Sequence, residues 1–344
     1  MGIKVLVVDD SATTRAILKE ILLSDTSIVL VETAMDAYSA RDKIVHHHFD
    51  VVCLDVEMPK MDGITFLKKM MRYFPLPTIM VSSHTFKNAE TTLEALDSGA
   101  VDFVLKPQVD LETCIDEIKE ELISKVKSAA QANIAKKVHH HTLKPKVILG
   151  KFEEYSKKDI IAIGASTGGV KAISDILTIL PKDTPGIVIV QHMPVGFTEQ
   201  FAKRLNSKCH LEVVEAKNGE KIERGKAIIA PGDKHMVIRK GLGNSYTIEV
   251  GIGEKVSGHR PSVDVLFNSV AKYAGGKALG VLLTGMGRDG AQGLVNIKKM
   301  GGLTVVQDEA SSVVYGMPKV ALELNGADVE LPLAQISQAI AEIS

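Results

Sequence analysis

Residues 160–169 read IIAIGASTGG, and this stretch decides the fold of the second half of the chain. The apolar run Ile160–Gly164 has the length of a buried β-strand, and the small residues after it mark a tight turn into a helix. The stretch also satisfies G-x-S-x-G, in which small flanking residues expose a serine hydroxyl on a strand-to-helix turn. It therefore predicts a parallel sheet with Ser166 at the carboxyl end of one strand.

The same alternation continues to the C-terminus. Strands are expected at Ile160–Gly164, Gly186–Val190, Ala227–Ala230, Ala278–Thr284 and Leu303–Gln307, helices at Gly169–Leu180, Thr198–Ser207 and Ala291–Met300, and a β-hairpin at Met236–Val250 with its turn at Gly241–Asn244. Alternating strands and helices form parallel sheets that are covered on both faces. Residues 158–344 are therefore expected to form a doubly wound, mainly parallel α/β domain with a small antiparallel addition.

The strand ends of this domain carry candidate catalytic side chains. A serine nucleophile needs a base, and the base needs a carboxylate to orient it. His192 follows the strand after Ser166, so it is the favoured base over His235 and His259, and either Asp289 or Asp308 could orient it. Backbone N–H groups at the start of the helix after Ser166 could stabilise an oxyanion. The chain order Ser, His, Asp argues against an α/β-hydrolase, in which the histidine comes last.

A second motif offers an alternative function. Gly285, Gly287 and Gly290 form G-x-G-x-x-G between a predicted strand and a predicted helix, and Asp308 lies 18 residues further on. This spacing is typical of dinucleotide-binding sites. Against that reading, Asp289 lies inside the glycine loop, where its charge would oppose a pyrophosphate.

Residues 1–125 show a second set of alternating elements. Strands are expected at Lys4–Val8, Ile28–Glu32, Val51–Leu54, Thr78–Val81 and Asp102–Leu105, with helices at Ser11–Leu23, Ala34–His46, Gly63–Tyr73, Ala89–Ser98 and Leu111–Lys127. This pattern again predicts a parallel sheet, and in such sheets function gathers at the carboxyl ends of the strands.

Those ends carry three acidic residues, a hydroxyl and a lysine. Asp9 and Asp10 follow the first strand, Asp55 the third, Ser82 the fourth and Lys106 the fifth. Three carboxylates at one sheet edge suit a hard cation such as Mg²⁺. A carboxylate can also attack a phosphoryl group, while a metal and a lysine offset the negative charge and a hydroxyl bonds a phosphoryl oxygen.

Composition and charge exclude several classes of protein. With 41 basic and 42 acidic residues, the chain of 344 residues has a net charge of −1, which gives no general attraction to nucleic acid or to an anionic membrane. No apolar run approaches the ~18 residues of a membrane span, so no membrane insertion is expected. The start of the chain lacks the pattern of a secretory signal. Three widely spaced cysteines fit neither a disulfide framework nor a zinc site, and a reduced cytoplasmic location is expected.

Charge also divides the chain into three parts. Residues 1–125 carry a net charge of −8, residues 126–157 carry +5, and residues 158–344 carry +2. The middle stretch is rich in lysine, contains Pro145 and Gly150, and lacks a strand pattern. It is therefore expected to be the exposed end of a helix followed by a linker between two domains.

The motifs of residues 1–125 together resemble a response-regulator receiver domain, with a flavodoxin-like (βα)5 fold. The resemblance implies that Asp55 accepts a phosphoryl group from a partner histidine kinase. It also implies that Asp9, Asp10 and Asp55 bind Mg²⁺, and that Ser82 and Lys106 support the phosphoryl group.

Residues 158–344 resemble the catalytic domain of the CheB-type chemotaxis methylesterases. The resemblance rests on the runs IAIGASTGG, QHMPVGFT, APGDKHM, HRPSVDVLF, LTGMGRDG and VVYGMP. It implies a triad of Ser166 as nucleophile, His192 as general base and then acid, and Asp289 as the orienting carboxylate. Thr167 and Met286 would lie beside the oxyanion. The implied reaction needs no cofactor: it hydrolyses glutamate γ-methyl esters, and deamidates specific glutamines, on methyl-accepting chemotaxis receptors.

The presence of both domains on one chain suggests regulation. By analogy with the family, the acidic receiver would cover the catalytic cleft until phosphorylation of Asp55 opens it. Two other classes stay open at this point: a signalling adaptor whose second domain binds a partner without catalysis, and a nucleotide-dependent oxidoreductase. A DNA-binding regulator is disfavoured, because no helix-turn-helix pattern stands out.

Overall fold

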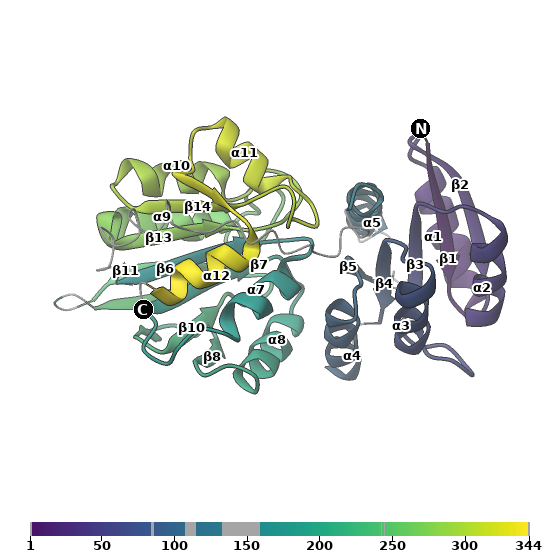
Figure 1. The fold of residues 1–344 in the computed structure, drawn as a ribbon, viewed down its shortest axis with the longest axis horizontal. Helices are drawn as coiled ribbons and strands as arrows, with labels where there is room; N and C mark the ends of the chain where they lie inside the picture. The colour runs from purple at the N-terminus through teal and green to yellow at the C-terminus, as the bar shows by residue number, and fades with distance from the viewer. Residues whose placement is uncertain are drawn as a thin grey trace. The chain divides into compact units, whose positions relative to one another are not determined.

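The computed structural model describes residues 2–83, 86–106, 115–132, 159–241, 243 and 245–342. The chain divides into two compact units, Met1–Lys137 and Val138–Ser344, and each is built around its own parallel β-sheet (Figure 1). Most of the expected linker lies outside the described residues. So does the start of the helix predicted from Leu111.

The first unit forms a five-stranded parallel sheet in the order β2-β1-β3-β4-β5. Its elements are β1 Ile3–Val8, α1 Ala12–Leu23, β2 Ile28–Ala34, α2 Ala37–His46, β3 Val51–Asp55, α3 Gly63–Tyr73, β4 Thr78–Ser82, α4 Phe86–Asp97, β5 Asp102–Leu105 and α5 Ile115–Ala130. The chain passes from β1 to β2 on one side and then to β3 on the other side of β1. The carboxyl ends of β1 and β3 therefore flank the point where the strand order reverses, which is where open α/β sheets bind ligands.

Side-chain caps set the helix boundaries of the first unit, and one of them corrects a prediction. Asp36 and Ser39 form a reciprocal capping box, so α2 begins at Ala37 and not at Ala34. The freed residues extend β2 to Ala34, beyond its expected end at Glu32. At the other end of the unit, α5 continues to Ala130, and its last turn buries Ala129 instead of lying exposed.

The second unit contains a seven-stranded parallel sheet in the order β15-β14-β13-β6-β7-β10-β8 and a three-stranded antiparallel sheet in the order β11-β12-β9. Its elements are β6 Ile160–Ala165, α7 Gly169–Leu177, β7 Gly186–Gln191, α8 Phe197–Asn206, β8 Glu212–Glu215, β9 Lys221–Ile222, β10 Lys226–Ile229, β11 His235–Lys240, β12 Tyr246–Gly251, α9 Val263–Tyr273, the 3-10 helix η1 Gly275–Lys277, β13 Ala278–Leu282, α10 Ala291–Lys299, β14 Leu303–Gln307, α11 Met317–Glu323, β15 Val329–Leu331 and α12 Leu333–Glu342.

These two units confirm the predicted fold class, including the antiparallel addition. The strands β8, β9 and β15 were not expected from the sequence, because each has only two to four residues and mixes charged with apolar side chains. The helix α9 was not expected either, although it is central to the second unit.

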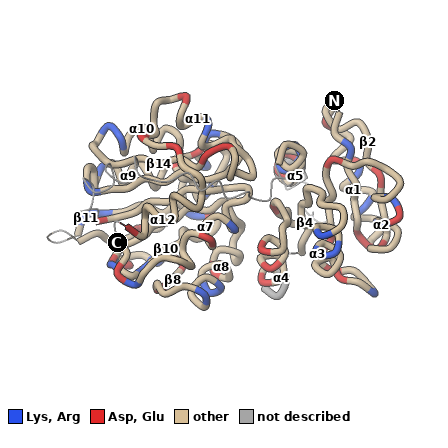
Figure 2. Tube along the Cα trace, viewed as in Figure 1, with Lys and Arg blue, Asp and Glu red and all other residues tan. Residues whose placement is uncertain are grey.

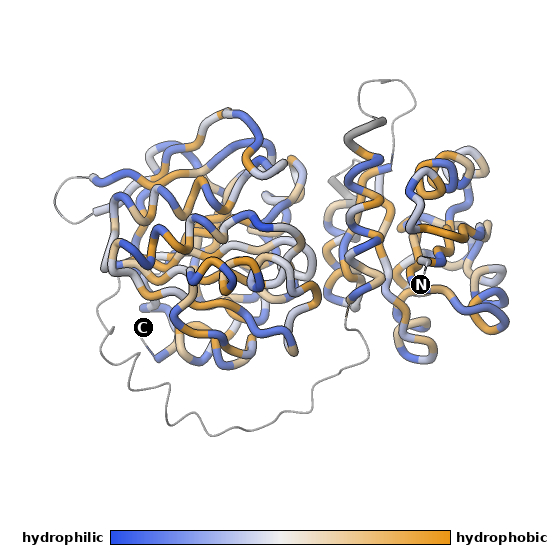
Figure 3. The backbone as a smooth tube through the Cα atoms, turned by 90° about the horizontal axis from the view of Figure 1, so that it is seen from above, coloured by the Kyte–Doolittle hydropathy of each residue, from blue (hydrophilic) through white to orange (hydrophobic). Residues whose placement is uncertain are grey.

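One continuous core joins the two sheets of the second unit. Ile160 and Val188 of the parallel sheet share a buried cluster with Ile238 and Ile248 of the antiparallel sheet and with Phe267 of α9. In Figure 3 the apolar positions follow the strands and the inner faces of the helices. Because α9 contacts both sheets, its N-terminal end is fixed relative to the carboxyl ends of the parallel strands.

The surface of the second unit carries charges of both signs. Basic and acidic positions are interspersed along the chain (Figure 2), and several pair directly, such as Lys203 with Glu199 at 2.7 Å and Lys226 with Glu220 at 2.6 Å. Within the described ranges, no helix has both the length and the apolar character needed to cross a bilayer.

Candidate functional site

Ser166 lies in the tight turn between β6 and α7. Its backbone N–H donates to the Thr284 carbonyl at 3.0 Å, and its own carbonyl accepts from the Gly169 N–H at 2.7 Å. Gly168 has a φ of +80°, and a Cβ on it would come within 2.6 Å of the Val313 side chain. The turn therefore requires glycine here, as the G-x-S-x-G pattern suggests. Ser166 itself stays partly accessible.

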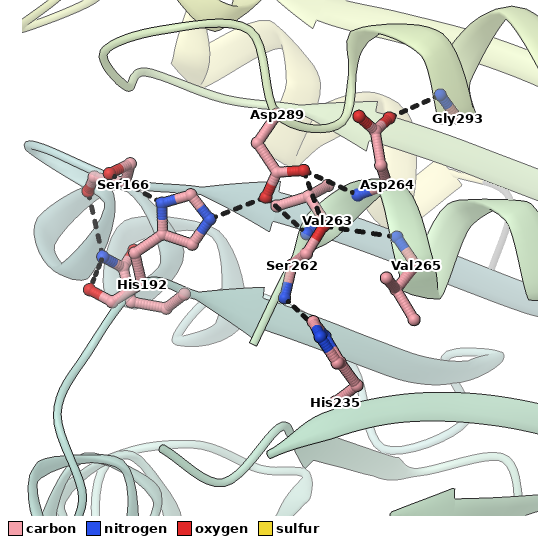
Figure 4. Close-up of polar contacts among 10 residues, drawn as sticks. Ser166, His192, His235, Ser262, Val263, Asp264, Val265, Asp289 and Gly293 are labelled. Carbon is pink, nitrogen blue, oxygen red and sulfur yellow. Dashed lines mark hydrogen bonds and ion pairs between the residues drawn. The ribbon is translucent and has the colours of Figure 1, made fainter. Parts of the chain in front are cut away.

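Three side chains from three strand ends form a continuous hydrogen-bonded chain (Figure 4). Nδ1 of His192, which follows β7, lies 3.1 Å from Ser166 Oγ, and its Nε2 lies 2.8 Å from Oδ2 of Asp289, which precedes α10. The His192 side chain is 9% exposed and that of Asp289 is 1% exposed, so both are largely shielded from water. The carboxylate can only accept, so Nε2 donates to it and Nδ1 is left to accept from the serine hydroxyl.

The ring is used in the opposite sense to the chymotrypsin-type triad, in which Nε2 faces the serine. The chemistry is equivalent, because either ring nitrogen can act as the base when the other is held as the N–H donor. What matters is that one nitrogen is left basic toward the hydroxyl.

Asp289 is held by four donors. Oδ2 accepts from His192 Nε2 and from the Val263 N–H at 2.7 Å, and Oδ1 accepts from Ser262 Oγ at 2.7 Å and from the Asp264 N–H at 3.0 Å. Burial acts to raise the pKa of Asp289, but the hydrogen bonds and charge of His192, together with the Ser262 hydroxyl, hold that pKa below its ordinary value. The Asp289 carboxylate is therefore ionised in the folded protein at neutral pH.

The alternatives to His192 and Asp289 have other contacts. His235 accepts from the Ser262 N–H at Nδ1, 3.2 Å away, and its Nε2 lies 2.8 Å from the Glu254 carbonyl. Asp308 accepts from the backbone N–H and the hydroxyl of Ser311, at 3.0 and 2.6 Å. His259 stacks on the His192 ring, with centroids 3.8 Å apart.

The two residues predicted beside the oxyanion come from neighbouring turns. Thr167 follows Ser166 and is buried, and its carbonyl accepts from Thr284 Oγ1 at 2.9 Å. Met286 follows Gly285, at which a Cβ would lie 2.8 Å from Ser166 Cβ. The loop after β13 therefore approaches Ser166 closely, and glycine at position 285 permits that approach.

This packing also explains the G-x-G-x-x-G pattern without a dinucleotide. Gly285 makes room for Ser166 and Met317, and Gly290, with a φ of +87°, makes room for Val263. The acidic residue inside the loop, Asp289, is committed to His192. The glycines of this loop therefore allow it to pack against Ser166 and to place Asp289 beside His192.

Several residues that hold the site together carry no clear signal in the sequence. Ser262, Val263 and Asp264 supply three of the four donors to Asp289, and only the pattern of a helix-capping serine before an apolar run could have indicated them. Gln191 was also missed: its buried amide donates to the carbonyls of Ser166 and His192 at 3.0 and 3.3 Å. No sequence motif signals that contact.

The first unit brings its predicted acidic residues together. Oxygen atoms of Asp9, Asp10 and Asp55 all lie within 4.8 Å of one another at the ends of β1 and β3. Asp9 and Asp55 are buried, and Asp10 is exposed. Lys106 Nζ, after β5, lies 2.9 Å from Asp9 Oδ2 and 2.8 Å from Asp55 Oδ2.

The cluster has the properties of a divalent cation site. Asp9 Oδ2 and Asp55 Oδ2 are buried and accept no hydrogen bond within the described residues, apart from their ion-pair contacts with Lys106. Burial raises the pKa of Asp55 to about 6, with the neighbouring Asp9 charge adding to the rise and Lys106 opposing it. Burial also acts to lower the pKa of Lys106, but its two carboxylate partners raise it overall, so the lysine stays charged. Clustered carboxylates with free lone pairs fit Mg²⁺.

Asp55 lies between a tightly packed turn and an open cavity. Gly63 packs so tightly on the turn after β3 that a Cβ would lie 1.9 Å from the Asp55 carbonyl oxygen. Ser82, at the end of β4, is buried and accepts from Thr92 Oγ1 at 2.9 Å. A cavity of about 490 Å³ opens beside the cluster, lined by Asp10, Val56, Glu57, Met58, Pro59, Asp62 and Thr91.

Comparisons with known proteins agree with the architecture of both units. The family model for the CheB methylesterase matches residues 161–340, and that for the response regulator receiver domain matches residues 5–119. The chain is 54% identical to the protein-glutamate methylesterase/protein-glutamine glutaminase of Sulfurimonas denitrificans, over 100% of this chain and 99% of that protein. It is 48% identical to the protein of the same description from Salmonella typhimurium, over 98% of this chain and 95% of that protein.

A solved structure agrees with these matches. The CheB methylesterase catalytic domain of Thermotoga maritima is 38% identical, with a TM-score of 0.53, and the match covers 54% of this chain and 99% of that one. The resemblance inferred from the sequence motifs is thereby confirmed.

The ring orientation of His192 gives a prediction about its tautomer. In the free protein, above the pH at which the ring takes up a second proton, His192 should carry its proton on Nε2, because Asp289 accepts there. Ring ¹⁵N chemical shifts report the tautomer directly, and His192→Gln identifies the signal by its loss. A neutral ring with its proton on Nδ1 would contradict the arrangement described here.

The raised pKa of Asp55 gives a prediction about stability. Asp55 has a pKa of about 6 in the folded protein and an ordinary value of 3.8, so it stays protonated to a higher pH in the folded state than in the unfolded state. Its contribution to stability is therefore lost as the pH rises from about 4 to 6. Asp55→Asn should stabilise the first unit at pH 7.5 by on the order of 1 kcal/mol, with the gain vanishing near pH 4.

Thermal unfolding of the full chain at both pH values measures this gain. Asp42→Asn removes an exposed carboxylate on α2 and is the matched control, with little expected change at either pH. A destabilised Asp55→Asn at pH 7.5 would show that its ion pair with Lys106 outweighs the cost of burial.

Proposed function

Because this chain belongs to the CheB methylesterase family and also carries a response regulator receiver domain, we propose that it is a protein-glutamate methylesterase and protein-glutamine glutaminase whose activity rises on phosphorylation. Its substrates are γ-methyl esters of glutamate, and specific glutamines, on chemotaxis receptors. Its phosphodonor is a chemotaxis histidine kinase.

One observation carries the proposal for the reaction. The chain of contacts from Ser166 Oγ through both nitrogens of His192 to Asp289 supplies a nucleophile, a base and an orienting anion in one largely buried line. That constellation supports acyl transfer, in which a hydroxyl attacks a carbonyl and a neighbouring base takes its proton.

Acylation uses His192 first as a base and then as an acid. Ser166 Oγ attacks the ester carbonyl carbon while its proton moves to His192 Nδ1, and a tetrahedral intermediate forms. When the intermediate collapses, the carbon–oxygen bond to the methoxy group breaks and Nδ1 returns the proton, so methanol leaves. Asp289 stabilises the imidazolium that forms between the two steps.

Deacylation repeats the same proton path with water. A water molecule gives its proton to His192 Nδ1 and attacks the acyl carbon, and the bond to Ser166 Oγ then breaks as the hydroxyl regains a proton. The products are a glutamate side chain and the free enzyme. A glutamine follows the same steps, with ammonia as the first product in place of methanol.

The oxyanion of each intermediate needs hydrogen-bond donors. We assign this role to the turn at Thr167 and to the loop at Met286, because both lie next to Ser166 at the N-terminal end of α7. Backbone N–H groups and the positive end of the helix dipole favour negative charge there. The reaction itself needs no cofactor.

The receiver unit supplies the switch. Asp55 accepts a phosphoryl group: its carboxylate oxygen forms the bond to phosphorus as the bond from phosphorus to the donor's histidine nitrogen breaks. A Mg²⁺ ion held by Asp9, Asp10 and Asp55 would offset the negative charge that builds up between the carboxylate and the phosphoryl group. Lys106 pairs with the phosphoryl oxygens, and the Ser82 hydroxyl hydrogen-bonds to one of them. Phosphorylation then shifts the population of the chain toward the more active form.

Methanol release from methyl-esterified receptor tests both halves of the proposal. Ser166→Ala removes the nucleophile, so release should fall at least about 10⁴-fold. Wild type should be stimulated by Mg²⁺ with acetyl phosphate, and Asp55→Ala should show no such stimulation, because it has no phosphoryl acceptor.

Ser174→Ala is the matched control for the nucleophile, because Ser174 lies on the adjacent helix α7 and is only partly buried. It should release methanol as wild type does. No methanol from wild type under any condition would overturn the esterase proposal and favour a signalling adaptor. Stimulation that persists in Asp55→Ala would overturn the assigned phosphorylation site alone.

A further inference from the structure

Ser262 contacts the last member of the catalytic line, which consists of Ser166, His192 and Asp289. It lies at the boundary between a loop and α9. It is fully buried, and its hydroxyl makes two contacts. It donates to Asp289 Oδ1 at 2.7 Å, and it accepts from the Val265 N–H at 3.4 Å, which makes Ser262 the N-cap of α9 (Figure 4). The same hydroxyl therefore links the start of a core helix to the carboxylate that orients His192.

Each oxygen of Asp289 accepts from one side chain and from one backbone N–H. Oδ2 receives His192 and one backbone N–H, whereas Oδ1 receives the Ser262 hydroxyl and one backbone N–H. Among the described contacts, Ser262 is the only side chain besides His192 that donates to this carboxylate. A buried anion turns its oxygens toward its donors, so the hydroxyl on Oδ1 keeps Oδ2 directed at His192.

A second histidine fixes the position of Ser262 itself. His235 Nδ1 accepts from the Ser262 N–H at 3.2 Å, and its Nε2 can then donate to the Glu254 carbonyl at 2.8 Å. This pattern needs His235 neutral, with its proton on Nε2. Ser262 is thus held from both sides, by His235 through its backbone and by α9 through its hydroxyl.

We propose that Ser262 is a positioning residue for the esterase reaction, which extends the line Ser166–His192–Asp289 by a fourth member. The inference rests on the proposed function. Ser262 touches no reacting atom: it acts on Asp289, which acts on His192. Its hydroxyl both orients the carboxylate and disperses part of its negative charge.

The charge balance around the line sets the direction of the expected pH effect. Asp289 faces His192 and the buried Asp264 carboxylate, whose Oδ1 accepts from the Gly293 N–H at 2.6 Å. The positive charge of Arg288 favours the ionised form of Asp264, and the His259 ring stacks on the His192 ring. Without the Ser262 hydroxyl, less of the Asp289 charge is compensated. The imidazolium form of His192 then gains stability, and the acid limb of the pH profile moves to higher pH.

Two variants test the proposal, because Ser262 also caps a helix. Ser262→Ala removes the hydroxyl and the cap. Ser262→Gly removes the hydroxyl but destabilises a helix start much less than alanine does. Both should lower kcat for methanol release by on the order of tenfold, as expected for a lost hydrogen bond to a charged group, with KM nearly unchanged. Ser262→Thr keeps the hydroxyl and should restore most of the activity.

Ser269→Ala is the matched control on the same helix. Its buried hydroxyl accepts from the Ile238 N–H at 3.0 Å and donates to the Leu266 carbonyl at 2.7 Å, without touching the catalytic line. It should lower stability without shifting the pH profile. If both Ser262 variants keep the wild-type pH profile and kcat, or change them no more than Ser269→Ala does, Ser262 is only a helix cap and the proposal is overturned.

A readout without turnover separates this inference from the proposed function. The ring ¹⁵N shifts of His192, followed against pH in the full chain, should show that its protonation midpoint rises in Ser262→Ala and Ser262→Gly but not in Ser269→Ala. Such a rise in a protein that releases no methanol would support the positioning role and overturn the esterase proposal. If wild type releases methanol but the protonation midpoint of His192 is unchanged in both Ser262 variants, the esterase proposal is supported and the positioning role of Ser262 is overturned.

Discussion

The buried carboxylate of Asp289 is the group on which the arrangement of the proposed catalytic site depends. An ionised group that is 1% exposed is tolerated only if donors replace the water it has lost, and here those donors come from His192 and from the first turn of α9. The position of α9 therefore has to be exact, and the core shared by the two sheets holds it there. The antiparallel sheet therefore supports the Asp289 site through its packing against this helix.

The two units treat their buried aspartates in opposite ways. Asp289 accepts four hydrogen bonds, its pKa lies below the ordinary value, and it stays an anion that orients a neighbour. The Oδ2 oxygen of Asp55 has the Lys106 ammonium as its only partner among the described residues, and burial raises the pKa of Asp55 to about 6. A carboxylate that accepts few hydrogen bonds keeps lone pairs available to bind a cation and to attack phosphorus, whereas one that accepts four is suited to stay in place. In the proposed function, the same residue type at a strand end thus has two roles, and the number of donors around it distinguishes them.

The sequence was informative wherever function follows from strand order. Parallel strands bring their carboxyl ends to one edge, so Ser166 could be grouped with His192, and Asp9 with Asp55 and Lys106, from the sequence. Strand order left Asp289 and Asp308 both open as the orienting carboxylate, and only the family resemblance favoured Asp289. The contacts around them could not be predicted. The donors Ser262, Val263 and Asp264 reach Asp289 only because α9 packs between distant segments, and the orientation of the His192 ring depends on those contacts. The short strands β8, β9 and β15 are defined by their neighbours in the sheets, so local pattern did not reveal them.

The most direct test of this account is the hydrolysis rate of Asp289→Asn on methyl-esterified receptor. Asparagine keeps the size of the side chain but removes the anion, so Nε2 of His192 loses its acceptor charge and the imidazolium loses its partner. We expect kcat to fall by about 10⁴-fold with KM largely retained. A loss of less than tenfold would contradict the account, because it would mean that the buried carboxylate does not govern the chemistry at Ser166.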